Sequence, residues 1–233
     1  MSKRFKGKRC AYCLAVPSVT ADHVFAREFF LPEDRQGLPQ VPACSDCNGR
    51  KSRLEHRLTA ILPFGARHGA ARRTLTTMVP KRLAKNVKLH QTLRDNWTKA
   101  WSKEAGVYVR TSAVPIGSAD IELFFGYVAR GLLVFHWGVY LRPEDSVTVL
   151  ALAEAGEEYF DGLLQMGAKN RIRADLGRGT FIYEGAQGVD LDQTSVWRVQ
   201  IYGGARFGDP ADPGHTASQI GIFTGPAAAG QQS

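Results

Sequence analysis

Four cysteines are the residues in this chain best suited to binding a metal. They form two pairs, Cys10-x2-Cys13 and Cys44-x2-Cys47, with 30 residues between the pairs. Four thiolates favour a tetrahedral structural zinc site, with Zn–S bonds of about 2.3 Å. Clustered pairs of cysteines, behind a basic N-terminus without an apolar signal segment, favour a metal over disulfides. We predict one structural Zn²⁺ on these four residues; free buried thiols or a redox pair are the alternatives.

A second group of polar residues lies between the two cysteine pairs and directly after them. Asp22 and His23 precede an apolar run, and Asn48 follows the last cysteine. Zinc binding would fold the intervening chain back, so we expect these three residues to converge. Carboxylate and amide oxygens suit Mg²⁺ or Mn²⁺, and a neutral imidazole, with a pKa of about 6.5, can take a proton from water. Together they offer the groups that phosphodiester hydrolysis requires.

Basic residues come immediately after this second group. Arg50, Lys51 and Arg53 begin the helix that we expect beside the proposed metal. They can bind nucleic-acid phosphates or form a solvated basic face, and both interpretations stay open. Glu55 lies two turns beyond Asn48, where we expect it to orient a neighbour or to face solvent.

In these features the sequence resembles the HNH, or ββα-metal, endonuclease family. The matching segments lie within residues 10–56 and read "CAYC", "ADHVFAREFF", "VPACSDCN" and the following "GRKS". The resemblance implies a ββα-metal module in which His23 is the general base, and in which Asp22 and Asn48 hold a catalytic Mg²⁺ or Mn²⁺. The chain departs from the family at the middle asparagine, which corresponds here to Pro39, with Gln40 adjacent.

Charge is distributed unevenly along the chain. Residues 1–110 hold 22 Lys and Arg against 8 Asp and Glu, whereas residues 111–233 hold 8 against 14. A field of one sign on one half of a protein concerns its partners rather than its fold. DNA is the partner we expect, because neutralised phosphates release counterions and so drive association. Solubility alone is the alternative explanation.

The most apolar stretch, residues 123–141, approaches the length of a membrane span but contains Arg130 and His136. Arginine at a bilayer centre costs about 2.5–3.5 kcal/mol even on the lenient insertion scale. We therefore predict a buried helix of a soluble, cytoplasmic protein that has no membrane partner.

The N-terminal half is predicted to contain three parts. We expect a mobile basic arm at residues 1–9 and the zinc-containing HNH module at 10–62. The module ends in a helix that Pro63 stops, and its apolar positions recur at helical spacing: Leu54, Leu58, Ile61 and Leu62. Residues 63–105 are predicted to be a linker followed by one basic helix, with Pro80 in its first turn.

The sequence of the C-terminal half predicts an α+β domain over residues 106–224, built on a small antiparallel sheet. A short strand, "GVYVRTSAV", precedes a buried helix at 119–138 and an acidic helix near 147–166. Alternating, β-branched or aromatic runs then indicate four strands: "NRIRADL", "GTFIYEG", "SVWRVQIYGG" and "SQIGIFTG". We expect a disordered tail at 225–233. The fold class is thus α+β, with an HNH module, helices and a small antiparallel-sheet domain.

Three functions are consistent with these features. The first is a metal-dependent HNH endonuclease that hydrolyses DNA, whose C-terminal domain binds a protein partner or a second copy of the chain. The second is a zinc-ribbon nucleic-acid-binding protein with a degenerate, non-cleaving site, which Pro39 permits. The third is an interaction module in which Asp22 and His23 are structural. Cleavage with and without Mg²⁺ separates the first from the others, and salt-dependent DNA binding separates the second from the third.

Overall fold

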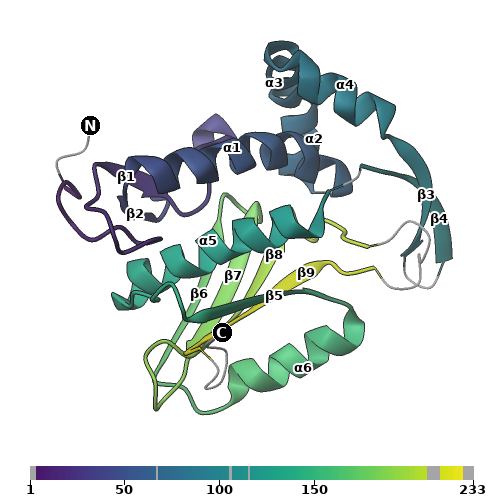
Figure 1. The fold of residues 1–233 in the computed structure, drawn as a ribbon. Coiled ribbons are helices and arrows are strands. Elements are labelled where there is room, and N and C mark those ends of the chain that lie inside the picture. The colour runs from purple at the N-terminus through teal and green to yellow at the C-terminus, as the bar shows by residue number, and fades with distance from the viewer. Residues whose placement is uncertain (1–3, 67, 105–106, 115, 209–215, 228–233) are drawn as a thin grey trace, which may run out of the picture.

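The computed structural model describes residues 4–66, 68–104, 107–114, 116–208 and 216–227, and it shows a mixed helix-and-strand fold (Figure 1). The α-helices are α1 (Ser45–Ile61), α2 (Gly69–Thr77), α3 (Val79–Lys85), α4 (Val87–Asp95), α5 (Ser118–Trp137) and α6 (Glu154–Gln165). The strands are β1 (Thr20–His23), β2 (Gln40–Ala43), β3 (Thr98–Glu104), β4 (Val107–Ala113), β5 (Ser146–Leu152), β6 (Asn170–Leu176), β7 (Phe181–Gln187), β8 (Ser195–Ile201) and β9 (Gln219–Gly225). Short 3₁₀ helices are η1 (Arg27–Phe29), η2 (Pro32–Asp34) and η3 (Leu62–Gly65).

A five-stranded antiparallel sheet, in the order β5-β9-β8-β7-β6, forms the centre of the C-terminal half, and α5 and α6 cover its opposite faces (Figure 1). The side chains of β8 alternate between buried and half-buried, as expected for a strand whose two faces differ. On one face, Trp197 of β8 packs against Trp137 of α5, with ring centroids 4.7 Å apart. On the other face, Phe160 of α6 packs against Phe223 of β9 at 4.8 Å. The small antiparallel sheet predicted from the alternating runs is confirmed.

The apolar stretch predicted to be a buried helix forms α5. This helix contacts α1 and β2 on one side and strands of the sheet on the other, which explains why its sequence is apolar around most of its circumference. It ends at Gly138, whose φ of 68° is the left-handed conformation that terminates many helices. No helix in the described part of the chain is long and apolar enough to cross a membrane.

The cysteine-bearing segment and the C-terminal sheet share one hydrophobic core. Three rings from the loop between β1 and β2, those of Phe25, Phe29 and Phe30, surround Phe181 of β7 with centroid distances of 4.4–5.7 Å. The hydroxyl of Tyr202 donates a hydrogen bond of 2.7 Å to the carbonyl oxygen of Phe29. All five side chains are buried. The sheet therefore sets the conformation of the loop that follows β1.

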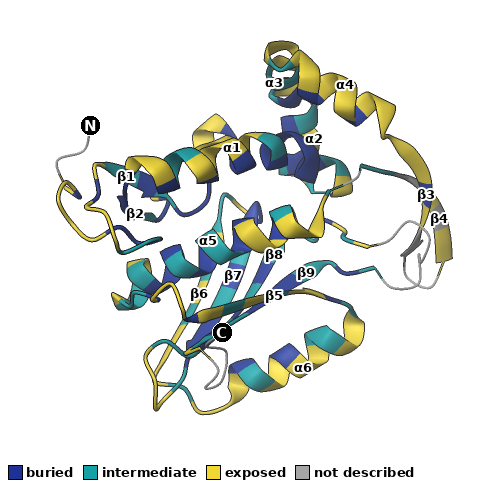
Figure 2. Cartoon of the chain, viewed as in Figure 1, coloured by how far each residue is buried: buried dark blue, intermediate teal, exposed yellow. Residues whose placement is uncertain are grey.

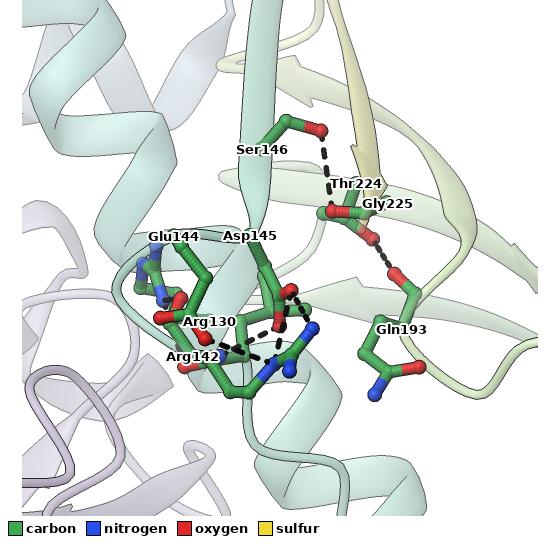
Figure 3. A network of polar contacts seen from close by, with 9 residues as sticks. Arg130, Arg142, Glu144, Asp145, Ser146, Gln193, Thr224 and Gly225 are labelled. Carbon is green, nitrogen blue, oxygen red and sulfur yellow. Dashed lines mark hydrogen bonds and ion pairs between the residues drawn. The ribbon is translucent and has the colours of Figure 1, made fainter. Parts of the chain in front are cut away.

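A network of polar contacts joins the end of α5 to the start of β5 (Figure 3). Arg130 of α5 donates to the carbonyl oxygen of Leu141 at 3.0 Å. The guanidinium of Arg142 pairs with the buried Asp145 at 3.1 Å, and the Arg142 backbone N–H donates to the same carboxylate at 2.7 Å. The arginine that argues against a membrane span thus holds the loop through which the chain enters the sheet.

Two predicted helices were wrong in extent. Residues 63–105 contain η3, α2, α3, α4 and β3 rather than a linker and one basic helix. Asn86 ends α3 and caps α4, because its side chain accepts a hydrogen bond of 3.0 Å from the N–H of Leu89. The acidic helix begins only at Glu154, because the preceding β-branched residues pair with β9 to form β5.

The basic arm was predicted to be mobile, and for residues 4–9 this was wrong. Phe5 is buried, and the backbone of Gly7 and Lys8 forms hydrogen bonds of 2.9 Å and 2.7 Å with the backbone of Ser18. Residues 1–3 lie outside the described part of the chain. So do residues 228–233 of the predicted disordered tail, and the tail's first residue ends β9.

The close approach of α5 to the segment after β1 can be tested with two glycines of the same helix. A Cβ on Gly131 would lie 2.9 Å from Cγ2 of Val24, whereas one on Gly126 would meet nothing within 4 Å. Gly126→Ala should therefore stabilise the protein by about 0.5–1 kcal/mol through helix propensity. Gly131→Ala should be less stable than Gly126→Ala by about 1–3 kcal/mol, the usual cost of overpacking. Urea unfolding measures both, and equal stability of the two variants would contradict this packing.

Candidate metal centre and active site

The four cysteines meet at the N-terminus of α1. Their sulfur atoms all lie within 4.8 Å of one another, and the Sγ atoms of Cys13 and Cys44 are 3.8 Å apart. A tetrahedron with Zn–S bonds of about 2.3 Å has edges of about 3.8 Å, so this spacing fits zinc. None of the four forms a disulfide. The cluster predicted from the two pairs is present, and it can hold a metal ion such as zinc.

Hydrogen-bond donors point toward the sulfur atoms of this cluster. The N–H of Cys44 donates to Cys10 Sγ at 3.4 Å, and the N–H of Cys47 donates to Cys44 Sγ at 3.5 Å. The guanidinium of Arg50 donates to Cys47 Sγ at 3.8 Å. Burial raises the pKa of the Cys10 and Cys47 thiols, so a bound cation is what would hold them as thiolates at neutral pH.

Asp22 is buried, and two donors bind one oxygen of its carboxylate. The hydroxyl of Tyr12 donates to Oδ2 at 2.6 Å, and Lys51 Nζ lies 3.1 Å from the same atom. Burial, reinforced by the Asp22 charge, raises the pKa of Tyr12 well above its usual 10, so the phenol stays protonated and remains a donor. Since a carboxylate offers about four lone-pair sites, Oδ1 keeps the capacity to bind a cation.

The side chain of Lys51 is fully buried. A lysine that contacts a phosphate of DNA would have to be on the surface. Its ammonium lies 3.1 Å from Asp22 Oδ2 and 2.5 Å from Glu55 Oε1, and it donates to the carbonyl oxygen of His23 at 2.7 Å. An ammonium has three donors, and here each one has an acceptor. The prediction that Lys51 binds nucleic acid is therefore corrected: this side chain ties α1 to the end of β1.

Glu55 is buried beside this ammonium, on the same face of α1. Burial raises the pKa of its carboxyl to about 7, although Lys51 acts in the opposite direction. Between its usual value of 4.5 and about 7, the folded chain holds a proton that the unfolded chain releases. The contribution of Glu55 to stability is therefore lost as the pH rises through this window. Of the two roles expected for Glu55, the structure favours orienting a neighbour.

His23 is half-buried at the end of β1, directly opposite Gln40 in the pairing with β2. The side-chain amide nitrogen of Gln40 lies 2.8 Å from Nε2 of the imidazole. The other ring nitrogen, Nδ1, makes no hydrogen bond to any residue that the structure describes. Burial lowers the pKa of His23 below its usual 6.5, against the opposing effect of Asp22, so the ring is neutral at pH 7. Gln40, the neighbour of Pro39, is thus the residue that contacts the proposed base.

The remaining predicted residues lie along the first turns of α1. Asn48 is half-buried one turn before Lys51, and residues three apart share a helix face. Asn48 therefore lies on the face of α1 that carries Lys51, and its side chain makes no hydrogen bond to the described residues. Arg50 and Arg53 are exposed on the outer side of the helix. The structure thus brings His23, Asp22 and the first turns of α1 together.

A cleft of about 300 Å³ opens between α1 and α3, next to the buried ion pairs. Glu28, Ser52 and Glu55 line one part of it, and Lys81 and Lys85 line another. The two lysines are exposed, so a phosphate group that entered from solvent would meet cations at this entrance. Of the residues around Lys51, Glu55 is the one that lines this cleft.

The burial of Lys51 and the contact of Tyr12 with Asp22 were not predicted from the sequence. Only the burial of Lys51 is indicated by a pattern in the sequence. The burial of Lys51 follows from helical spacing, because Cys47, Lys51, Leu54 and Leu58 recur every three or four residues on the inner face of α1. Tyr12 stands inside the first cysteine pair without any pattern that connects it to Asp22. Its contact with Asp22 depends on how the segment from Cys10 to Cys13 folds.

The chain matches no protein-family model, no curated protein and no solved structure. The segment from Cys10 to the end of α1 provides a four-cysteine cluster, a buried carboxylate and a neutral imidazole.

Zinc binding gives the first test of this site. The purified chain should contain one zinc ion per molecule, and a chelator strong enough to remove it should lower the melting temperature, because the binding energy of a structural metal is folding energy. Cys47→Ser should lose the metal, whereas Ser45→Ala on the same helical turn should keep it. Elemental analysis measures the metal content. A chain without zinc, or one whose mass shows two disulfides, would contradict the prediction.

The internal role of Lys51 gives a second test. Lys51→Met keeps an apolar stem but leaves Asp22 and Glu55 without their cation, and removing one partner of a buried ion pair costs about 3–5 kcal/mol. Arg53→Met, on the exposed side of the same helix, should change stability by no more than about 0.5 kcal/mol. Urea unfolding compares the two variants, and a Lys51→Met protein as stable as Arg53→Met would rule out the internal role.

Proposed function

We propose that this chain is a metal-dependent HNH-type endonuclease that hydrolyses DNA phosphodiester bonds. His23 is the general base, Asp22 and Asn48 hold Mg²⁺ or Mn²⁺, and the four cysteines hold a structural zinc ion. The observation that carries the proposal is the neutral His23 ring held by Gln40 on the β1–β2 hairpin, beside a buried carboxylate. The α1 helix that bears Asn48 is bound to this hairpin through Lys51.

Hydrolysis needs a base for the attacking water, and His23 can supply it from Nδ1. In the structure the Gln40 amide nitrogen makes the 2.8 Å contact with Nε2. The tautomer that leaves Nδ1 unprotonated requires the amide to turn by 180°, so that its carbonyl oxygen accepts a hydrogen bond from Nε2–H. An unprotonated ring nitrogen near neutral pH is suited to accepting a proton from water. Arg53 and the exposed Lys81 and Lys85 can then contact phosphates elsewhere along the bound DNA.

The donor set around Asp22 fits a hard divalent cation. Oδ1 of Asp22 and the amide oxygen of Asn48 are oxygen ligands, and Mg²⁺ commonly completes its shell with water and substrate phosphate. When bound there, the ion would stabilise the negative charge that develops on the leaving 3′ oxygen.

One observation favours a second function, a zinc-ribbon nucleic-acid-binding protein whose HNH-like site does not cleave. The ammonium of Lys51 already lies 3.1 Å from Asp22 Oδ2, so it balances the charge that a divalent cation would need. Pro39 stands where the family has its middle asparagine. The basic excess of residues 1–110 supports either function.

Cleavage by His23→Ala distinguishes the two functions. Loss of a general base typically slows a reaction about 10²–10⁴-fold, while DNA affinity should stay within about threefold because the zinc cluster and the basic surface are intact. Asn48→Ala should instead raise the Mg²⁺ concentration needed for half-maximal rate. Supercoiled plasmid incubated with Mg²⁺ or Mn²⁺ gives the rate, and anisotropy of a labelled duplex gives the affinity.

The matched control is His90→Ala, an exposed histidine on α4 that does not line this cleft, which should cleave at the wild-type rate. The melting temperature of each variant shows whether a loss of rate follows unfolding. A stably folded His23→Ala protein with the wild-type rate would refute the assigned mechanism. A wild-type chain that binds DNA but cleaves with neither metal would support the second function.

A further inference from the structure

The hairpin of β3 and β4 stands apart from the five-stranded sheet, beside α4 (Figure 1). Its register places Trp101 directly opposite Arg110. Paired residues share a face of a hairpin, and so do residues two positions apart on one strand. Lys99 and Trp101 on β3 therefore lie on the same face as Tyr108 and Arg110 on β4, so aromatic and cationic residues alternate on this face.

Both aromatic side chains of this face are open to solvent. Trp101 is 54% exposed and Tyr108 is 53% exposed. Figure 2 shows most of the described side chains of these two strands as exposed, in contrast to the central strands β7, β8 and β9 of the large sheet. Diagonal neighbours across an antiparallel pair lie about 7–8 Å apart, so each ring can contact its own flat ligand group. Two large exposed rings on one narrow ribbon indicate a binding surface.

The opposite face of the hairpin is turned toward the protein. Ala100 is buried, and Ala100 and Ala113 line a cleft of about 1200 Å³ between the hairpin and the body, which Trp101 also borders. Leu89 and Leu93 of α4 belong to a small apolar cluster that packs against the residue after β4. The hairpin is thus joined to the body at its base, a cleft lies behind its alanine face, and its aromatic face is left to an external partner.

The charge around this face identifies the kind of partner. Residues 63–114 contain 11 Lys and Arg against 2 Asp and Glu. Lys99 and Arg110 are exposed, and neither forms an ion pair with a described residue. Lys85 and Lys88, at the end of α3 and the start of α4, are exposed as well. A surface that combines unpaired cations with exposed rings is complementary to a polyanion that carries flat groups.

We propose that this face of the β3–β4 hairpin binds DNA with unpaired bases. Trp101 and Tyr108 each stack on a base, and Lys99 and Arg110 contact the phosphates on either side. Stacking on side chains requires bases whose faces are accessible, which the interior of a duplex does not offer. The inference rests on the proposed function for the choice of DNA as the polyanion, and it names single-stranded DNA, or DNA with an unpaired end, as the substrate class.

The experiment measures binding rather than cleavage. Anisotropy of a labelled oligothymidylate and of a blunt duplex of equal length is recorded without added divalent metal. Trp101→Ala and Tyr108→Ala should each weaken binding of the oligothymidylate roughly tenfold, the size of one base-stacking contact, and that of the duplex by less than about threefold. Trp101→Phe should retain most of the affinity, and Arg110→Gln should reduce the salt slope by about 1 for both DNA forms.

Tyr159→Ala is the matched control, since Tyr159 is 63% exposed on α6 in the acidic half and should not affect binding. The inference is overturned if a Trp101→Ala/Tyr108→Ala double variant with the wild-type melting temperature binds oligothymidylate as tightly as wild type. It is also overturned if that variant loses affinity for both DNA forms equally, or if it only converts a dimer to a monomer. A chain that binds single strands through Trp101 but never cleaves would contradict the proposed function and leave this inference standing.

Discussion

The buried ammonium of Lys51 fixes the geometry on which both candidate sites depend. It binds the carboxylates of Asp22 and Glu55 and the carbonyl oxygen of His23, so it holds α1 against the end of β1. A buried cation without these acceptors would cost several kcal/mol, so the three contacts constrain one another. The cysteine cluster at the start of α1 and the imidazole at the end of β1 therefore keep one relative position.

The parts of the fold that could be predicted from the sequence are those with a local periodic pattern. The strands β6 to β9 alternate in sequence, and α5 is apolar along its length, so neighbouring residues alone indicate them. The strand β4 was predicted from its sequence, but β3 follows Trp97 in a stretch that also fits a helical pattern. The strand β5 precedes an acidic helix without a turn residue between them. Pairing decides the structure in both places: β3 pairs with the neighbouring β4, and β5 pairs with the distant β9. Neither pairing leaves a periodic pattern that separates the strand from the helix beside it.

In the candidate site too, some features could be predicted from the sequence and others depend on the folded structure. The spacing of the cysteines and the neighbouring Asp22 and His23 were sufficient to predict which residues could do chemistry. The contact of Gln40 with His23 depends on the register of β1 and β2. The contact of Tyr12 with Asp22 depends on how the segment from Cys10 to Cys13 folds. Amino-acid type alone does not specify either arrangement, because both residues are common in unrelated environments.

The three phenylalanines between β1 and β2 make the small N-terminal unit dependent on the rest of the chain. Phe25, Phe29 and Phe30 complete a core whose other wall is the C-terminal sheet. A fragment limited to residues 10–62 would expose these rings to water, and the loop after His23 would lose the surface that shapes it. The N-terminal unit therefore cannot be transferred on its own. A recombination event or a chimaera that moved the cysteines and His23 into another protein would have to move the sheet as well.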